Sequence, residues 1–205
     1  MNAIPLFASA HAALYATSPE DKCQQVFSLW QAWQAQRTHW DKGTPIDPDC
    51  RVGRPERPLL VPPNEVEQRK PASLEGRAIL LHAITHIEFN AINLALDAVY
   101  RFREMPLAYY GDWLKIAKEE AEHFTLLQRL LQQKGYDYGA FNAHNGLWEM
   151  AQKTHHDVMI RMALVPRILE ARGLDVTPSI YNKLQQAKEH DACAILDVIL
   201  REEIG

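Results

Sequence analysis

The positions of the prolines are the feature that most constrains how this chain can fold. Seven of the twelve prolines lie between residues 45 and 71, and none lies between residues 72 and 105. Proline removes a backbone donor and clashes with the preceding helical turn, so the first stretch cannot be a regular helix, whereas the second can be one long helix. No stretch shows the strict apolar–polar alternation of a half-buried strand. The sequence therefore predicts an all-α fold.

Helix signals divide the chain into an N-terminal part, residues 1–72, and a four-helix bundle, residues 73–205. Ser18 followed by Pro19 predicts an N-cap and a helix that ends near residue 37. Residues 41–73 form a proline-rich segment, called the strap below. It is either wrapped over the surface or a mobile arm, and we favour the wrapped form. The four predicted bundle helices cover residues 74–103, 112–134, 147–188 with a break between Gly173 and Thr177-Pro178, and 190–205.

A glutamate and a histidine interrupt the apolar face of the second bundle helix. Glu120 and His123 lie on the stripe formed by Ile116, Leu127 and Leu130, so we expect both to be buried. Glu119 and Glu122 lie on the other side, where lysines one turn away can pair with them. A buried Glu-x-x-His pair is what a helix offers to a metal ion. The alternative is a Glu–His hydrogen bond within the core.

The other three bundle helices repeat this pattern, because each places a glutamate on its apolar stripe. Together they make most of a six-ligand di-metal site, and oxygen with imidazole ligands suits iron or manganese. His156-Asp157 is the alternative ligand from the third helix. His82 and His86 could hydrogen-bond to the metal ligands and orient them, could bind a separate metal ion as a pair, or could simply be hydrogen-bonded within the core. The predicted metal ligands are Glu88, Glu120, His123, Glu170 and Glu203.

Composition narrows the classes of function. The net charge of −4 gives no strong field that would attract nucleic acid or an anionic membrane. The apolar run at residues 78–83 contains His82 and is far shorter than the ~20 residues that span a bilayer. Three widely spaced cysteines indicate neither a disulfide framework nor a cysteine zinc site. We expect a cytoplasmic protein.

Several motifs resemble the ferritin-like bacterial family catalogued as domain-of-unknown-function family 455. The resemblance covers residues 50–205 and implies a ferritin-like fold with a di-iron type of site, but no established activity. Residues 168–172 are also similar to a short segment of the di-iron hydroxylases that modify tRNA. The motifs are Gly53–Pro58 with Leu60-Val61, His82–Glu88, Asp112–Leu114, Glu119–Phe124, Leu147–Glu149, Leu169–Pro178 and Glu203–Gly205.

These observations favour a di-iron oxidase or hydroxylase that activates dioxygen, with manganese or zinc as alternative metals. Its substrate would be a small molecule or a modified nucleoside, and the chain could form a homo-oligomer. The alternatives are a ferroxidase or other iron-handling protein, and a structural bundle with a redox-silent metal. In the resembled family a histidine follows the Glu203–Gly205 motif. We therefore expect this chain to be a truncated form whose last helix is short and whose metal site is incomplete.

Overall fold

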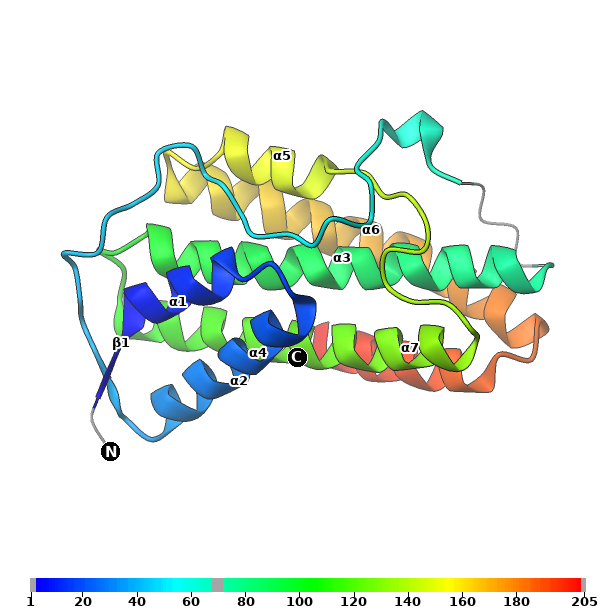
Figure 1. Ribbon diagram of the computed structural model, residues 1–205, viewed down its shortest axis with the longest axis horizontal. Helices are drawn as coiled ribbons and strands as arrows, with labels where there is room; N and C mark the ends of the chain where they lie inside the picture. The colour runs from blue at the N-terminus through cyan, green and yellow to red at the C-terminus, as the bar shows by residue number, and fades with distance from the viewer. Residues whose placement is uncertain (1–2, 68–71, 204–205) are drawn as a thin grey trace. The chain divides into compact units, whose positions relative to one another are not determined.

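The computed structural model describes residues 3–67 and 72–203, and their side chains except those of residues 166–177 and 203. As predicted, the protein is mostly helical (Figure 1). The prediction missed β1 (Ile4–Pro5) and β2 (Thr38–His39), which pair in parallel and are too short to show an alternating pattern. The helices are α1 (Leu6–Tyr15), α2 (Pro19–Gln34), the 3₁₀ turn η1 (Pro63–Glu65), α3 (Leu74–Arg101), α4 (Leu107–Gln133), α5 (Gly146–Lys153), α6 (Val158–Gln186) and α7 (His190–Glu203).

The N-cap of α2 was predicted correctly, but the start of α4 was not. The Ser18 side chain accepts a hydrogen bond from the Asp21 N–H at 3.2 Å. Helix α4 begins at Leu107, directly after Pro106, so Gly111 lies inside the helix. A Cβ atom at Gly111 would come within 3.4 Å of the Trp33 indole nitrogen. Trp33 of α2 therefore lies next to Gly111, and this glycine does not mark a helix boundary.

The third bundle helix was predicted with the wrong ends. Helix α5 stops at Lys153, and the Asp157 side chain then caps α6 by accepting hydrogen bonds from the N–H groups of Met159 and Ile160. Helix α6 continues without a break through Gly173 and Pro178. Relative to alanine, a glycine inside a helix costs about 1 kcal/mol and a single proline about 3 kcal/mol, which packing of the rest of the helix can outweigh, whereas seven prolines within 27 residues cannot be accommodated in this way.

The chain divides into two compact units. The first comprises Met1–Glu56 and Glu88–Glu122, and the second comprises Arg57–Ile87 and His123–Gly205. Each of the long helices α3 and α4 contributes one half to each unit. The division between residues 72 and 73 that the sequence suggested stays a prediction.

In the first unit, α1 packs against α2, the second half of α3 and the first half of α4. Phe7 of α1 makes an edge-to-face contact with Tyr110 of α4, with ring centroids 5.8 Å apart. The fully buried Lys22 donates hydrogen bonds from Nζ to the carbonyls of Ala13 and Leu14. These carbonyls lie at the end of α1, so the ammonium group caps that helix. Burial lowers the pKa of Lys22 to about 7.

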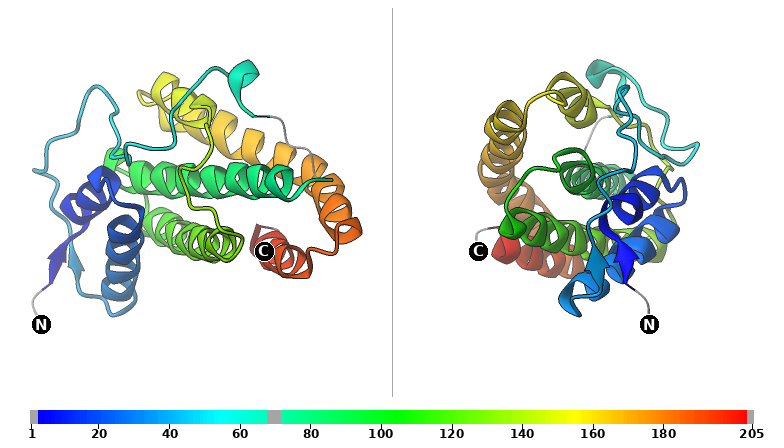
Figure 2. Two further views of the ribbon diagram at one scale, coloured as in Figure 1. Left: turned by 45° about the vertical axis from the view of Figure 1, so that its right-hand side comes forward. Right: turned by 90° about the vertical axis from the view of Figure 1, so that its left-hand side faces the viewer.

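In the second unit, parts of four helices share one apolar core. Figure 2 shows α7, in red, alongside the second half of α4, in green. The Glu189 carboxylate receives hydrogen bonds from Arg77 and Lys134, so it ties the start of α3 and the end of α4 to the turn between α6 and α7. The core residues are Ala78, Leu80, Leu81 and Ile84 of α3, Leu127, Leu130 and Leu131 of α4, Leu184 of α6, and Ala192, Cys193, Leu196 and Ile199 of α7.

Within the described residues, α3 is the one helix long and apolar enough to cross a membrane. Its most apolar window is 83% buried inside the protein. A mostly buried core helix of a soluble protein meets the same criterion, so α3 is weak evidence for a membrane span. The sequence interpretation overlooked it because polar side chains interrupt the apolar runs.

The described part of the strap, residues 41–67, is held against each unit, in agreement with the wrapped form. In the first unit the Asp41 carboxylate accepts hydrogen bonds from the first N–H groups of α1. Tyr100 donates to the Pro45 carbonyl, and its hydroxyl accepts from the Asp47 N–H. In the second unit the strap pairs with residue 143 through main-chain hydrogen bonds. Leu60 is 40% exposed, so main-chain hydrogen bonds rather than apolar cover hold this stretch.

Asp47 is the main polar anchor of the strap. Its carboxylate accepts hydrogen bonds from the Tyr15 hydroxyl, from the Arg51 guanidinium and from the backbone N–H groups of Asp49 and Arg51. Burial alone would raise the pKa of Asp47. The hydrogen bonds from Arg51, Tyr15 and the backbone outweigh burial and hold that pKa well below its usual range.

We predict that Asp47→Asn lowers the free energy of unfolding by about 1–3 kcal/mol at pH 7, because charge-assisted hydrogen bonds are lost. A depressed pKa stabilises the folded state above pH ~4 and loses this effect as the pH falls. The difference between wild type and variant should therefore shrink below pH 4. Trypsin cleavage after Arg51 should also accelerate. Trypsin cleaves poorly before proline, and prolines follow Arg54 and Arg57. Cleavage of the Arg51–Val52 bond therefore reports on whether this stretch is held.

The matched control is Asp49→Asn, since the Asp49 side chain is 71% exposed and lies 3.9 Å from Arg51. This change should alter the free energy of unfolding by less than ~0.5 kcal/mol. Equal destabilisation by the two changes, or rapid cleavage after Arg51 in the wild type, would contradict the anchoring role of Asp47.

Candidate metal centre

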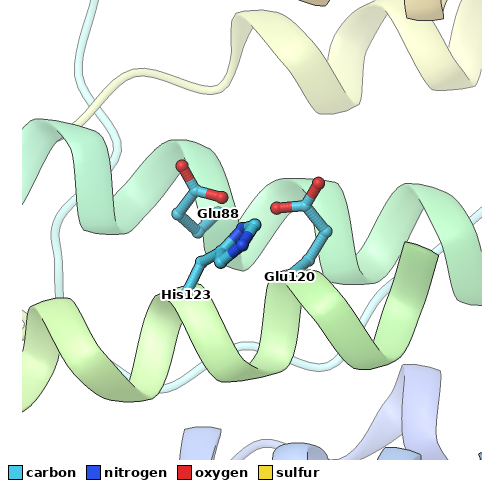
Figure 3. Close-up of side chains that lie close together, drawn as sticks. All are labelled: Glu88, Glu120 and His123. Carbon is cyan, nitrogen blue, oxygen red and sulfur yellow. The ribbon is translucent and has the colours of Figure 1, made fainter. Parts of the chain in front are cut away.

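Three of the predicted metal ligands come together between α3 and α4. One oxygen of Glu88, one oxygen of Glu120 and one ring nitrogen of His123 all lie within 4.8 Å of one another. In Figure 3, Glu120 and His123 rise from α4 toward α3, which carries Glu88. Glu120 and His123 are three residues apart, so they stand one turn from each other on the same side of α4.

The burial of this cluster is unusual for charged groups. Glu88 is 4% exposed and His123 is 2% exposed. Glu120 is half-buried, but its Oε2 atom is shielded from solvent, as is Nδ1 of His123. Phe89 and Phe124, the next residues after two of the ligands, are fully buried. Two carboxylates held this close repel each other in surroundings poor in water, and a divalent cation would compensate their charge.

The donor set and its dimensions fit such a cation. Bonds from carboxylate oxygen or imidazole nitrogen to divalent metals are about 2.0–2.6 Å long. Donor atoms within 4.8 Å of one another can therefore contact one ion with small side-chain movements. Two carboxylates and one imidazole suit iron, manganese or zinc better than a soft thiophilic metal. Among the described residues, this is the one group of three or more such side chains with this spacing.

The neighbouring glutamates of α4 behave differently from this pair. Glu122 forms an ion pair with Lys118 at 2.7 Å and keeps 42% of its side chain exposed. Glu119 pairs with Lys115 at 3.2 Å, but only 15% of its side chain is exposed. Glu119 is therefore partly shielded from solvent, and both of the i,i+4 pairs expected from the sequence are present. Glu122 is the better reference for a solvated glutamate on this helix.

The structure engages His82 and His86 with the loop that follows α4. His82 Nε2 accepts a hydrogen bond from the Gly139 N–H at 2.9 Å. His86 Nδ1 lies 2.8 Å from the Tyr138 hydroxyl, and its Nε2 lies 3.2 Å from the His144 carbonyl oxygen. A carbonyl can only accept, so Nε2 of His86 carries a proton and Nδ1 of the neutral ring accepts from Tyr138. In this arrangement both histidines position the loop.

The remaining candidates lie elsewhere or outside the described side chains. His156 is exposed, and Asp157 caps α6. The side chains of Glu170 and Glu203 lie outside the described residues. Met159, near the start of α6, is 75% exposed, and the inward orientation of Glu170 stays a prediction.

Sequence reasoning missed one residue beside the cluster. Glu202 of α7 lies with its Oε2 atom 2.7 Å from His123 Nε2, and its side chain is 35% exposed. The interpretation of α7 selected Glu203, four residues after the buried Ile199, whereas Glu202 is three residues after it. Both spacings place a side chain near the same helix face, so the sequence pattern alone could not choose between them.

We predict that Glu120→Ala lowers the number of metal ions bound per chain, because it removes one of three converging ligands. Glu122→Ala should leave metal binding near the wild-type level. Metal content after loading with Fe²⁺ or Mn²⁺ and gel filtration measures both. Equal loss in the two variants would show that the rotation of α4 is wrong.

A second prediction concerns His82. Burial lowers the pKa of His82 to about 4, so the folded protein binds this proton less readily than the unfolded chain. The neutral His82 contributes fully to the free energy of unfolding above pH ~6.5. This contribution declines as the pH falls toward 4, by about 1–3 kcal/mol in total. Urea unfolding in EDTA at several pH values tests this.

The comparison is with His82→Gln, whose side-chain oxygen can still accept from the Gly139 N–H. The variant should lose less stability than the wild type between pH 6.5 and 4. Parallel pH profiles for the two proteins would contradict a buried neutral His82.

Comparisons with known proteins show a family for this chain but supply no activity. The chain is 49% identical over 203 residues to an uncharacterized protein of Haemophilus influenzae. The aligned region covers 94% of this chain and 70% of that protein. No solved structure matches. Residues 15–205 match the family described as Protein of unknown function (DUF455), and the chain belongs to that family.

Proposed function

We propose that this protein is a ferritin-like carboxylate metalloprotein that holds two iron ions and oxidises an organic substrate with dioxygen. The observation that carries the proposal is the cluster of Glu88, Glu120 and His123, whose ligand atoms lie within 4.8 Å of one another. The shared core of α3, α4, α6 and α7 in the second unit also supports it, because a bundle of four helices is the scaffold of such sites.

The second ion requires ligands beyond the three that converge. Glu170 on α6 and Glu203 on α7 are the proposed source of the additional carboxylates. Four carboxylates would nearly neutralise two divalent ions and would favour the more oxidised metal states. Bound iron would supply the electrons that the reduction of dioxygen requires.

The side chains of this protein would act in three ways. Glu88 and Glu120 would hold positive charge in a buried position, and His123 would provide a neutral nitrogen ligand. Phe89 and Phe124, which directly follow two of the proposed ligands, are fully buried and would help to keep water out of this part of the protein. Exclusion of water strengthens every electrostatic interaction at the site and limits side reactions.

The test is anaerobic loading with Fe²⁺ followed by exposure to oxygen. We expect oxygen uptake and a new ferric absorption band in the wild type, and neither above background in His123→Ala. A protein loaded with Zn²⁺ serves as the redox-silent control. Iron bound without any change on exposure to oxygen would overturn the oxidase proposal and would leave a structural metal.

The same experiment separates an oxidase from an iron-handling protein. A ferroxidase turns over with Fe²⁺ and dioxygen alone, which accepts the electrons of the iron, and accumulates ferric product. An oxidase or hydroxylase takes up little oxygen after the first turnover unless an organic compound and a reductant are present. Sustained turnover with Fe²⁺ alone would therefore reject the leading proposal in favour of iron oxidation.

A further inference from the structure

We infer that Glu202 is a positioning residue for the metal centre, which fixes the imidazole of His123 so that Nδ1 faces the metal. The inference rests on the proposed metal binding by Glu88, Glu120 and His123, but not on the proposed oxygen chemistry. It adds α7 to the elements that shape the centre.

The hydrogen bond defines the state of the imidazole. His123 Nε2 lies 2.7 Å from Glu202 Oε2, a distance typical of a charge-assisted hydrogen bond. An ionised carboxylate only accepts, so Nε2 must carry a proton. A neutral imidazole has one N–H, which leaves the lone pair on Nδ1. This nitrogen is shielded from solvent, as expected for an atom that binds a buried ion.

Glu202 itself stands apart from the cluster. It is not a member of the group whose ligand atoms all lie within 4.8 Å of one another. Its side chain is 35% exposed, whereas His123 is 2% exposed. Glu202 therefore contacts the Nε2 side of the imidazole, and its carboxylate stays partly exposed to solvent. A carboxylate in this position orients a ligand and raises its basicity without replacing it.

Packing makes α7 a suitable support for this contact. Leu196 and Ile199 of α7 belong to the same apolar core as Leu127 of α4, four residues after His123. Ile199 and Glu202 are separated by one helical turn, so the packed residue fixes the approach of the carboxylate. The hydrogen bond and the core contact thus lie on the same face of α7.

The test uses Zn²⁺ as the probe, because it is redox-silent and compatible with NMR. We compare wild type, Glu202→Ala and Glu202→Gln, whose side-chain oxygen can still accept from Nε2–H. Asp197→Ala is the matched control, since it removes an exposed carboxylate from the same helix. The readouts are the dissociation constant, the stoichiometry of Zn²⁺ and the ring ¹⁵N chemical shifts of His123 with and without metal.

In the metal-free wild type, the ¹⁵N shifts should show protonated Nε2 and unprotonated Nδ1, and Zn²⁺ should bind Nδ1. Glu202→Ala should release this preference and raise the dissociation constant about 10–100-fold at unchanged stoichiometry. Glu202→Gln should keep the preference and raise the constant by a smaller factor. Asp197→Ala should match the wild type in every readout.

Four results would overturn the role of Glu202. They are binding of Zn²⁺ through Nε2, loss of stoichiometry in Glu202→Ala, an unchanged dissociation constant in Glu202→Ala, and an equal loss of affinity in Asp197→Ala. Loss of stoichiometry would make Glu202 a ligand. If the wild type bound no Zn²⁺, the metal centre and this role would both fail. If Zn²⁺ binding followed the expectation while iron gave no reaction with oxygen, only the oxidase proposal would fail.

Discussion

Burial of α3 on nearly all sides is the constraint on which the rest of this structure depends. Between Ala78 and Arg101, only Ala83, Ile87 and Ala91 are not buried. A polar side chain in such a helix stabilises the fold when it has a partner, since an uncompensated buried polar group costs about 1–3 kcal/mol. The polar residues of α3 therefore determine which other segments of the chain are held against it.

Most of these polar residues lie on one face and bind irregular segments. In the second unit, His82 and His86 contact the loop after α4. In the first unit, Asn90 accepts a hydrogen bond from Arg54, and Arg101 pairs with Asp97 and donates to the Asp47 carbonyl. Spacings of four and seven residues keep these positions on one side of a helix. The strap and the loop are thus held by the polar face of a helix that is otherwise apolar.

Glu88 lies on the opposite face, two residues from both His86 and Asn90 and therefore about 200° around the helix. There it meets Glu120 and His123 of α4. The two faces of α3 therefore differ: hydrogen bonds on one face hold the surrounding chain, and the other face contributes Glu88 to the candidate metal site. This division also explains why His82 and His86, although close in sequence to Glu88, engage the loop.

The sequence by itself determined the helices that carry the centre and three of its residues. Proline-free spacing defined α3, and the position of Glu120 and His123 on an apolar stripe indicated a site, because a helix repeats every 3.6 residues. Only the tertiary structure decided the rest. The cap at Asp157 set the start of α6, α4 began directly after Pro106, and Glu202, not a residue inferred from spacing, reached His123. Local pattern fixes which side of a helix is buried, whereas the partner of each buried polar group depends on how separate helices pack.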